Sequence, residues 1–438
     1  MRRTLFLLPL LIGSLLSSQT HEKIPLEKAI ADGIKMDHEY RNSTLNEQSA
    51  DIGQRLAEKN RLFNLDFGAG YRYQSETMAV EISPTQIPGI GTFPGRSIEA
   101  GLHHNFDLKL GLVQPLFTGG RLANAVKMEE VRRAVESNMR ILKSIEITGR
   151  IKASYFQHLF LVRQKQSLMA TKNTLELHRR RLENLLEEGL LRKTDLLETL
   201  SKTQEVELAA RDVVQALESE KIQFQDLCGY LPEEIESGYK ERALSRDEAV
   251  IHFQEHHPVL KTLNKKLDIL DIQKKIVTGK RLPQVTGFAE IHYGKPGIDF
   301  FAKAWSLYFQ GGISVNFNVF DWNKLGAEKE LIEIEKEKVS NEKNQFIREV
   351  TKSLDQLFTA LESLTNKLGD VDRLIAYSKE DTELKAALYA EGQIPNIDYL
   401  TSLLSQEKNV LLREEILIQI EQAKVRIHSL IGMGKEEG

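Results

Sequence analysis

The stretch LFTGGRL at Leu116–Leu122 has a counterpart later in this 438-residue chain, where VFDWNKL occupies Val319–Leu325, 203 residues further on. At the same offset, EGLLRKTDLL at Glu188–Leu197 aligns with EGQIPNIDYL at Glu391–Leu400. Each match is short, but the two share one offset and keep their order along the chain. Internal matches of this kind indicate a duplicated architecture, in which each copy is one structural unit.

Earlier segments match at a different offset. Arg61-Leu62 aligns with Arg281-Leu282, which lies 220 residues further on. The difference of 17 residues falls within residues 71–105, a segment with several prolines and glycines. Surface loops tolerate changes of length best, so we expect a longer loop there in the first copy. We predict a first structural repeat over residues 21–238 and a second over residues 239–438.

Both copies show the same order of elements, and the predicted fold is α+β and mostly α. A helix of moderate length comes first, followed by two strands, a very long helix, a turn with a glycine and a last helix. The helices are expected at about 25–60, 122–187 and 193–229 in the first copy, and at about 246–279, 324–389 and 396–431 in the second. The strands are expected at about 62–75, 104–117, 283–294 and 305–320.

Apolar and polar residues alternate along the predicted strands. FDLKLGL at residues 106–112 and ISVNFNV at 313–319 each place every apolar side chain on one face. The strand at 285–293 is less regular because Phe288 interrupts the pattern. Such alternation is typical of a soluble sheet that packs on a core, but runs of about ten residues are also long enough for tilted membrane strands.

Leucines spaced by seven residues run along both long helices. The two series are Leu161, Leu168, Leu175 and Leu182, and Leu354, Leu361, Leu368 and Ile375. This spacing is typical of left-handed pairing as in a coiled coil. A helix of about 66 residues is roughly 100 Å long. The two shorter helices of each copy together have about that length, so we expect them to run alongside the long helix.

The amino terminus has the layout of a secretory signal peptide, which we place at residues 1–20. Arg2 and Arg3 precede an apolar stretch that is too short to span a bilayer, and small polar residues follow. Without Arg2 and Arg3 the formal charge of −4 becomes −6, which gives no electrostatic footprint for nucleic acid. The only cysteine is Cys228, so no intramolecular disulfide is expected.

Four strands per chain cannot close a barrel, and an open strand edge in lipid leaves backbone groups unpaired. If the strands span a membrane, copies of the chain must associate. A dimer would supply about eight strands and a barrel filled by side chains, whereas a trimer would supply about twelve and leave a lumen. A conducting channel therefore favours the homotrimer. The charged residues expected to face its lumen are Asp66, Arg72, Asp107 and Lys109.

The sequence resembles the TolC family of outer-membrane efflux proteins. The residues that carry the resemblance are IPLEKAI at 24–30, QPLFTGGR at 114–121 and the turn at 188–197, together with the duplication. The resemblance implies a homotrimer in the outer membrane, with a 12-stranded transmembrane barrel and a long periplasmic helical barrel. It also implies docking to a periplasmic adaptor (membrane fusion) protein and an inner-membrane pump. Such a subunit is a passive conduit for small molecules or polypeptides in tripartite efflux or type I secretion. It is not an enzyme and needs no cofactor.

The resemblance assigns an adaptor contact to one of the glycine-containing turns. Gly189 and Leu190 correspond to the contact that the family makes at its periplasmic tip, and Gly392 is the second-copy equivalent. Both glycines also fit the left-handed residue that ends many helices, since glycine adopts that conformation without steric strain. The two interpretations are compatible.

The resemblance also implies an acidic ring at the periplasmic aperture. Asp398 matches the acidic position of that gate, with Asp195 and Glu198 in the first copy. Two positions depart from the family pattern, because Thr401 replaces a second acid and Ile394 replaces a basic residue. Asp398 equally fits an acid at a helix N-terminus, where the helix dipole favours negative charge.

Two other functions compete with the channel. A periplasmic coiled-coil adaptor would also have long helical hairpins, but it does not require two equivalent pairs of strands at the same place in each copy. HFQEH at His252–His256 fits the H-x-x-E-H pattern of zinc peptidases. No catalytic domain surrounds it, so we expect no metal site there.

Overall fold

The computed structural model describes residues 23–434, so the predicted signal peptide lies outside the described residues. The chain divides into two compact units. One is helical and contains residues 23–38, 144–249 and 354–434. The other contains the strands and comprises residues 39–143 and 250–353. Each unit takes residues from both predicted repeats.

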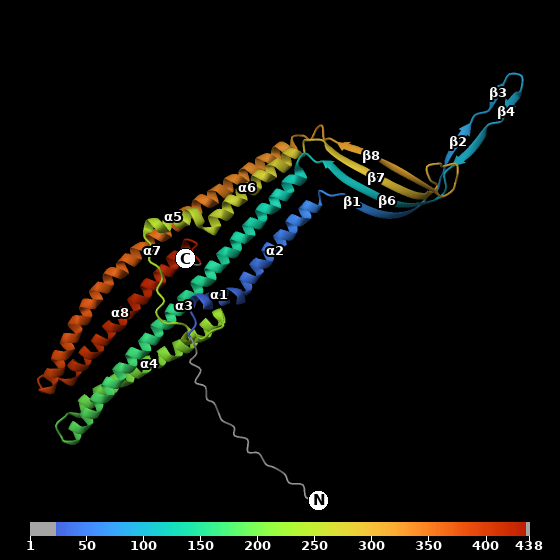
Figure 1. Cartoon of the computed structure of the whole chain (residues 1–438). Helices are drawn as coiled ribbons and strands as arrows, with labels where there is room; N and C mark the ends of the chain where they lie inside the picture. Colours follow the sequence, from blue (N-terminus) through green and yellow to red (C-terminus); the bar gives the residue numbers. More distant parts are fainter. Residues whose placement is uncertain (1–22, 435–438) are drawn as a thin grey trace, which may run out of the picture. The chain divides into compact units, whose positions relative to one another are not determined.

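The helices follow the predicted order (Figure 1). They are α1 (Leu26–Met36), α2 (His38–Lys59), α3 (Arg121–Glu187), α4 (Lys193–Cys228), α5 (Arg246–His256), α6 (Pro258–Gly279), α7 (Lys324–Ala390) and α8 (Asn396–Leu430), with a short 3₁₀ helix at Pro232–Glu234. The long helices α3 and α7 and the last helices α4 and α8 begin and end within a residue of their predicted bounds.

The first helix of each copy is broken in two, and a single helix was the wrong expectation. In the first copy the break is at Asp37, whose backbone is extended. In the second copy it is at His257, directly before Pro258. The residue before a proline is disfavoured in the helical region, and proline has no N–H to donate. His257 instead caps α6, because its Nδ1 accepts a hydrogen bond from the N–H of Val259 (3.1 Å).

In the helical unit, α3 packs on α4 through the predicted seam. Leu161, Leu168, Leu175 and Leu182 are all buried. The first three share a cluster with residues of α4 and α8, namely Val206, Val213, Leu217 and Leu400. In the second copy Leu354 is buried, whereas Leu361, Leu368 and Ile375 are only partly covered in the single chain.

The linker between the two copies is held by a buried charge. The side chain of Glu241 is fully buried and lies 2.8 Å from Lys152 Nζ and 2.7 Å from His428 Nδ1. Burial alone would raise the pKa of the Glu241 carboxyl, but the hydrogen bonds from His428 and Lys152 outweigh it and the pKa is lowered. Glu241 is therefore ionised at neutral pH and fixes the linker to α3 and α8.

The other unit is built around a four-stranded antiparallel sheet in the order β1-β6-β7-β8 (Figure 1). The strands are β1 (Asn64–Tyr73), β6 (His104–Phe117), β7 (Gln284–Lys295) and β8 (Ser306–Asn316). The register aligns the apolar positions of all four strands, as in the row Phe67, Leu110, Ile291 and Phe309. Side chains directly opposite one another share a face, so the sheet has one apolar face and one polar face.

Two further features of the strands differ from expectation. The longer loop of the first copy is not irregular, because β2 (Met78–Ile82) pairs with β5 (Arg96–Ala100) and β3 (Thr85–Ile87) with β4 (Gly91–Phe93). It forms a narrow ribbon beyond the sheet (Figure 1). In addition, β8 ends at Asn316 and not near residue 320, since Asn316 pairs with Gln284, the first residue of β7. No strand of the described segment lies opposite the residues that follow Asn316.

The strand-to-helix junctions of the two copies differ in sequence but not in backbone conformation. Gly119 and Gly120 precede α3 with φ of 60° and 78°. At the equivalent places before α7, Trp322 and Asn323 have φ of 55° and 58°. A bulky residue such as tryptophan rarely adopts this left-handed conformation, which costs of order 1–3 kcal/mol. The side chain of Trp322 is 83% exposed, so packing within the chain does not explain the strain.

Candidate functional site

The turns that join α3 to α4 and α7 to α8 have the same conformation. Gly189 and Gly392 are left-handed, with φ of 73° and 72°. In both turns the glycine N–H donates to the carbonyl three residues earlier (3.0 Å), and the next N–H donates to the carbonyl five residues before it (2.9 Å). This is the Schellman ending of a helix, so the prediction that both glycines are C-caps is confirmed. The role of Gly189, Leu190 and Gly392 in an adaptor contact stays a prediction.

A hollow of about 490 Å³ lies between the two turns. Three of the predicted site residues line it, namely Leu190, Asp195 and Gly392. Leu190 is 71% exposed, which is unusual for a leucine and leaves an apolar side chain available at the turn. The structure therefore brings residues of both predicted sites, adaptor contact and gate, to one place.

Asn396, the first residue of α8, connects the two hairpins below the turns. It is 1% exposed, and its Nδ2 donates to the carbonyl oxygen of Asp195 (2.9 Å) and to Thr199 Oγ1 (3.1 Å). Its Oδ1 lies 2.8 Å from Nε2 of His178 on α3. The predicted gate residue Glu198 is at the margin of this network, 3.5 Å from Nδ2. The amide thus ties the start of α8 to α3 and α4.

Aromatic rings enclose the Asn396 network. Tyr389 of α7 stacks on Tyr399 of α8, with centroids 5.9 Å apart and planes within 9°, and His178 meets both rings edge-on. Burial lowers the pKa of His178, and the hydrogen bond to Asn396 only partly offsets this. The ring is therefore neutral at neutral pH and donates from Nε2 to the amide oxygen.

Two of the three predicted gate acids lie at helix starts. Asp398 is exposed in the first turn of α8, and Asp195 occupies the equivalent place in α4. Both positions suit an acid on electrostatic grounds alone. The sequence pattern did not single out Asn396 or His178, because a polar residue that begins a helix usually caps it. Their contact spans 218 residues of sequence, and the repeat offers no counterpart, since Lys193 occupies the place of Asn396 in the first copy.

All four predicted lumen residues lie on the polar face of the sheet. The register places Asp66, Asp107 and Lys109 there at alternate positions, with Arg72 further along β1. Lys109 Nζ pairs with Glu290 Oε1 at 2.8 Å. The network continues through residues that the sequence pattern did not flag. His292 Nδ1 lies 3.0 Å from Asp107, and Gln310 Nε2 donates to Glu290 (2.6 Å).

The opposite face is apolar, and no part of residues 23–434 covers it. Phe67, Phe309 and Ile313 are each about two-thirds exposed, at 71%, 67% and 68%. Aromatic residues gather near both ends of the strands, as Tyr71, Tyr73, Phe106, Tyr293 and Trp305 at one end and Phe117, Phe317, Phe320 and Trp322 at the other. Among the helices within residues 23–434, none has both the length and the apolar character needed to cross a bilayer.

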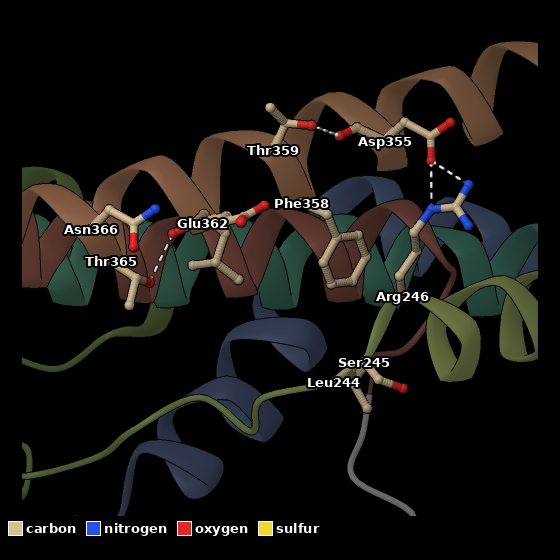
Figure 2. Close-up of a pocket in the computed structure, with 10 residues that line it drawn as sticks. Leu244, Ser245, Arg246, Asp355, Phe358, Thr359, Glu362, Thr365 and Asn366 are labelled. Atoms are coloured by element: carbon tan, nitrogen blue, oxygen red, sulfur yellow. Dashed lines mark hydrogen bonds and ion pairs between the residues drawn. The ribbon is translucent and has the colours of Figure 1, made fainter.

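A second hollow, of about 720 Å³, opens on the helical unit between the linker and α7 (Figure 2). Arg246 lies at one end and pairs with Asp355 at 2.7 Å. Phe358 and Leu361 supply apolar surface, and Glu362 adds an acid. None of the predicted site residues lines this hollow.

The histidines of the H-x-x-E-H pattern lie on one helix, α5. The rings of His252 and His256 have centroids 5.1 Å apart. In the described part of the chain, no group of three or more His, Cys, Asp or Glu residues is placed to hold a metal ion.

Comparison with solved structures finds the same fold in several outer-membrane channels. The channel CusC superposes with a TM-score of 0.73 at 15% identity, covering 94% of this chain and 93% of its own. VceC of Vibrio cholerae gives 0.72 at 14% identity, covering 93% and 96%. The open state of MtrE of Neisseria gonorrhoeae gives 0.71 at 13% identity, covering 94% and 91%.

No protein-family model and no curated protein sequence matches the chain. At identities this low, the likeness establishes the fold. The predicted fold class, α+β and mostly α, and the predicted resemblance to TolC-family channels are confirmed at that level.

Proposed function

We propose that this chain, which has the fold of TolC-family outer-membrane channels, is the channel subunit of an export system in the outer membrane of a Gram-negative cell. It serves as a passive conduit for small molecules or polypeptides, in tripartite efflux or type I secretion, and catalyses no reaction. The observation that carries the proposal is the two-faced sheet. Its strands have membrane length, one face is apolar and exposed, and the other is charged.

The physical argument starts from the apolar face. A contiguous apolar surface of this extent is unfavourable in water and marks a surface that lipid or protein covers. The strands β1 and β8 are open edges of the sheet, and unpaired backbone groups cannot remain in hydrocarbon. Neighbouring copies must complete the ring. A homotrimer gives about twelve strands and a lumen lined by the polar face.

We infer that the hairpin turns form the periplasmic gate. Asn396 ties α8 to α3 and α4, and each chain in a trimer would contribute one such tie. Asp398, Asp195 and Glu198 add negative charge around the aperture. Separation of the hairpins would open the conduit, and the driving energy comes from the pump because the subunit itself has no source of energy.

The proposed partners are a periplasmic adaptor protein and an inner-membrane pump. Leu190 offers the exposed apolar contact at the turn, and the left-handed glycines keep the turns tight. A Cβ on Gly189 or Gly392 would meet no atom within 4 Å, so a partner can approach the backbone there.

Adjacent residues on opposite faces of β8 give a matched test. Phe309 lies on the apolar face in a row near the middle of the strands, and Gln310 lies on the polar face. Phe309→Lys should block assembly in the outer membrane, since a lipid-facing lysine costs about 2–4 kcal/mol at the bilayer centre. Gln310→Lys should assemble and change only the ion selectivity in planar bilayers.

Equal behaviour of these two variants would refute the assignment of the faces. Recovery of the unmodified chain in the soluble periplasmic fraction would instead favour the coiled-coil adaptor.

A further inference from the structure

The two hairpins of the sheet are equivalent residue by residue. The ladder between β1 and β6 begins with Asn64 opposite Val113. Adding 220 to the first number and 203 to the second gives Gln284 and Asn316, the pair that begins the ladder between β7 and β8. The sequence offsets therefore relate the backbones of the two copies, strand by strand and in register.

The seam between the copies supplies the rest of the geometry. Within the chain, the second strand of the first copy (β6) pairs with the first strand of the second copy (β7). Two strands remain with an open edge, namely the second strand of the second copy (β8) and the first strand of the first copy (β1). These are the equivalents of β6 and β7, so the in-chain seam is a template for a seam between chains.

We infer that β8 of one chain pairs with β1 of a neighbouring chain, its partner, in a register that the in-chain seam specifies. Gly111 lies opposite Glu290 in the chain. The offsets move this pair to Ser314 and the partner's Gly70. The next pair, Leu112 and Ala289, moves to Val315 and the partner's Ala69. The inference deepens the proposed function and rests on it for the existence of the oligomer.

The faces of the strands test this register independently. Val315 and Ala69 both belong to the apolar face, and Ser314 and Gly70 both belong to the polar face. A register shifted by one residue would place each apolar residue opposite a polar one, because side chains alternate with a period of two. The transferred register continues both faces across the seam.

The register also accounts for exposed residues that follow β8. Phe317 is 55% exposed and Val319 is 84% exposed in the single chain. In the first copy the equivalent residues belong to β6, which continues to Phe117 beside β7. Residues 317 and 318 would pair with the partner's Phe67 and Asp66 and lengthen β8.

The exposed, strained Trp322 acquires a neighbour in the same way. In the chain, a Cβ added to Gly119 would clash with the carbonyl of Gly279 and touch Leu282. The offsets move Gly119 to Trp322 and move Gly279 and Leu282 to the partner's Lys59 and Leu62. Trp322 and the partner's Lys59 both carry a Cβ where the in-chain seam has two glycines, so these two backbones must lie further apart than those of Gly119 and Gly279. Leu62 is 63% exposed in the single chain, so two exposed apolar side chains would cover one another.

The seam between chains lacks the ion pair of the in-chain seam. The positions of Lys109 and Glu290 become Gly312 and the partner's Gly70. Backbone hydrogen bonds and the apolar face therefore hold the seam between chains. On the polar side of that seam, Gly312 and Ser314 are small, and the register places the partner's Arg72 opposite Gly312.

Disulfide trapping tests the register on the full chain in its native membrane. The variant Ser314→Cys with Gly70→Cys is oxidised and compared with Ser314→Cys with Gly68→Cys. Both glycines lie on the polar face and have room for a side chain. Directly opposite residues have Cβ atoms about 4.5–5.5 Å apart and diagonal ones about 7–8 Å, which a disulfide cannot bridge. The only native cysteine, Cys228, is buried.

The Gly70 variant should give covalent oligomers on a non-reducing gel, whereas the Gly68 variant should give monomer. Within one chain, β6 and β7 separate the edge strands β1 and β8 by roughly 14 Å, so any disulfide between them joins two different chains. The pair Val315→Cys with Ala69→Cys repeats the test on the apolar face.

Stronger trapping by the Gly68 variant would overturn the register, as would an intact native oligomer that none of the in-register pairs links. Absence of any oligomer from the unmodified chain would instead contradict the proposed function.

Discussion

Replacing Asn396 with alanine removes the tie between the two hairpins without adding charge or bulk. The amide makes three hydrogen bonds of 2.8–3.1 Å, to His178, Asp195 and Thr199. A buried hydrogen bond contributes about 1 kcal/mol, and each buried partner left unsatisfied costs about 1–3 kcal/mol. The tie in one chain is therefore worth roughly 3 kcal/mol.

A change of 3 kcal/mol corresponds to about two orders of magnitude in the ratio of closed to open hairpins. In planar bilayers, Asn396→Ala should raise the closed-state conductance and the frequency of openings. The exposed Asn344 of α7 supplies the control, because Asn344→Ala makes the same chemical change at a solvated position. A closed-state conductance equal to that of the Asn344→Ala variant would refute the reasoning.

The remaining predictions concern His178, Glu241, the two turn glycines and Asp398. The pKa of His178 is lowered by burial, so acidification below about pH 6.5 favours states in which the ring is exposed and can take a proton. The conductance in planar bilayers should therefore rise from pH 7.5 to 5. The variant His178→Gln should remove this dependence on pH. Glu241→Gln should lower the free energy of unfolding by about 3–5 kcal/mol, measured by denaturant titration, because it leaves a lysine buried without its counter-charge. The lowered pKa of Glu241 makes the native contribution present above about pH 4.5 and lost as the pH falls further, which acid titration followed by circular dichroism would check. Alanine at Gly189 or Gly392 should destabilise each turn by about 1 kcal/mol, seen as faster proteolysis of the hairpin, whereas asparagine should be tolerated better. Asp398→Ala should weaken the block of the channel by divalent cations, and an unchanged current would remove this residue from the gate.

Long local patterns predicted most of the fold. β6 lies at the predicted bounds, 104–117, and both long helices are within one residue of theirs. These elements have strong periodicity and clear end signals, such as the glycines before α3 and after its last turn. Local chemistry decides such boundaries, so a sequence pattern can reveal them.

Elements that depend on context were predicted less well. One helix was expected over 246–279, although Pro258 is a signal for the break between α5 and α6; Asp37 gives no comparable signal for the break in the first copy. The ribbon at 78–100 was expected only as a loop, because its prolines and glycines are typical of an irregular connection, and its strands depend on pairing that the sequence does not fix. The end of β8 at Asn316 follows from the absence of an opposite strand, which a pattern within β8 cannot show.

The residues of the candidate site also differ in how far the sequence predicted them. Alternation within β1 and β6 placed Asp66, Asp107 and Lys109 on one face, because a strand's faces are a local property. Glu290 was missed although it lies on the same face, since Phe288 obscured the pattern of β7. Asn396 could not be found locally, because its partners come from helices about 200 residues away.

The contact between Gly119 and Gly279 has a mechanical consequence. A Cβ on either would clash with the carbonyl of the other, so the backbones of the two junctions touch directly and no side chain cushions them. Packed backbone is nearly incompressible and offers no hinge. The base of the sheet must therefore move with the adjoining ends of α3 and α6 as one piece. In the proposed channel, the pore lined by the sheet would therefore keep its bore, and the movements of gating would have to arise elsewhere in the subunit.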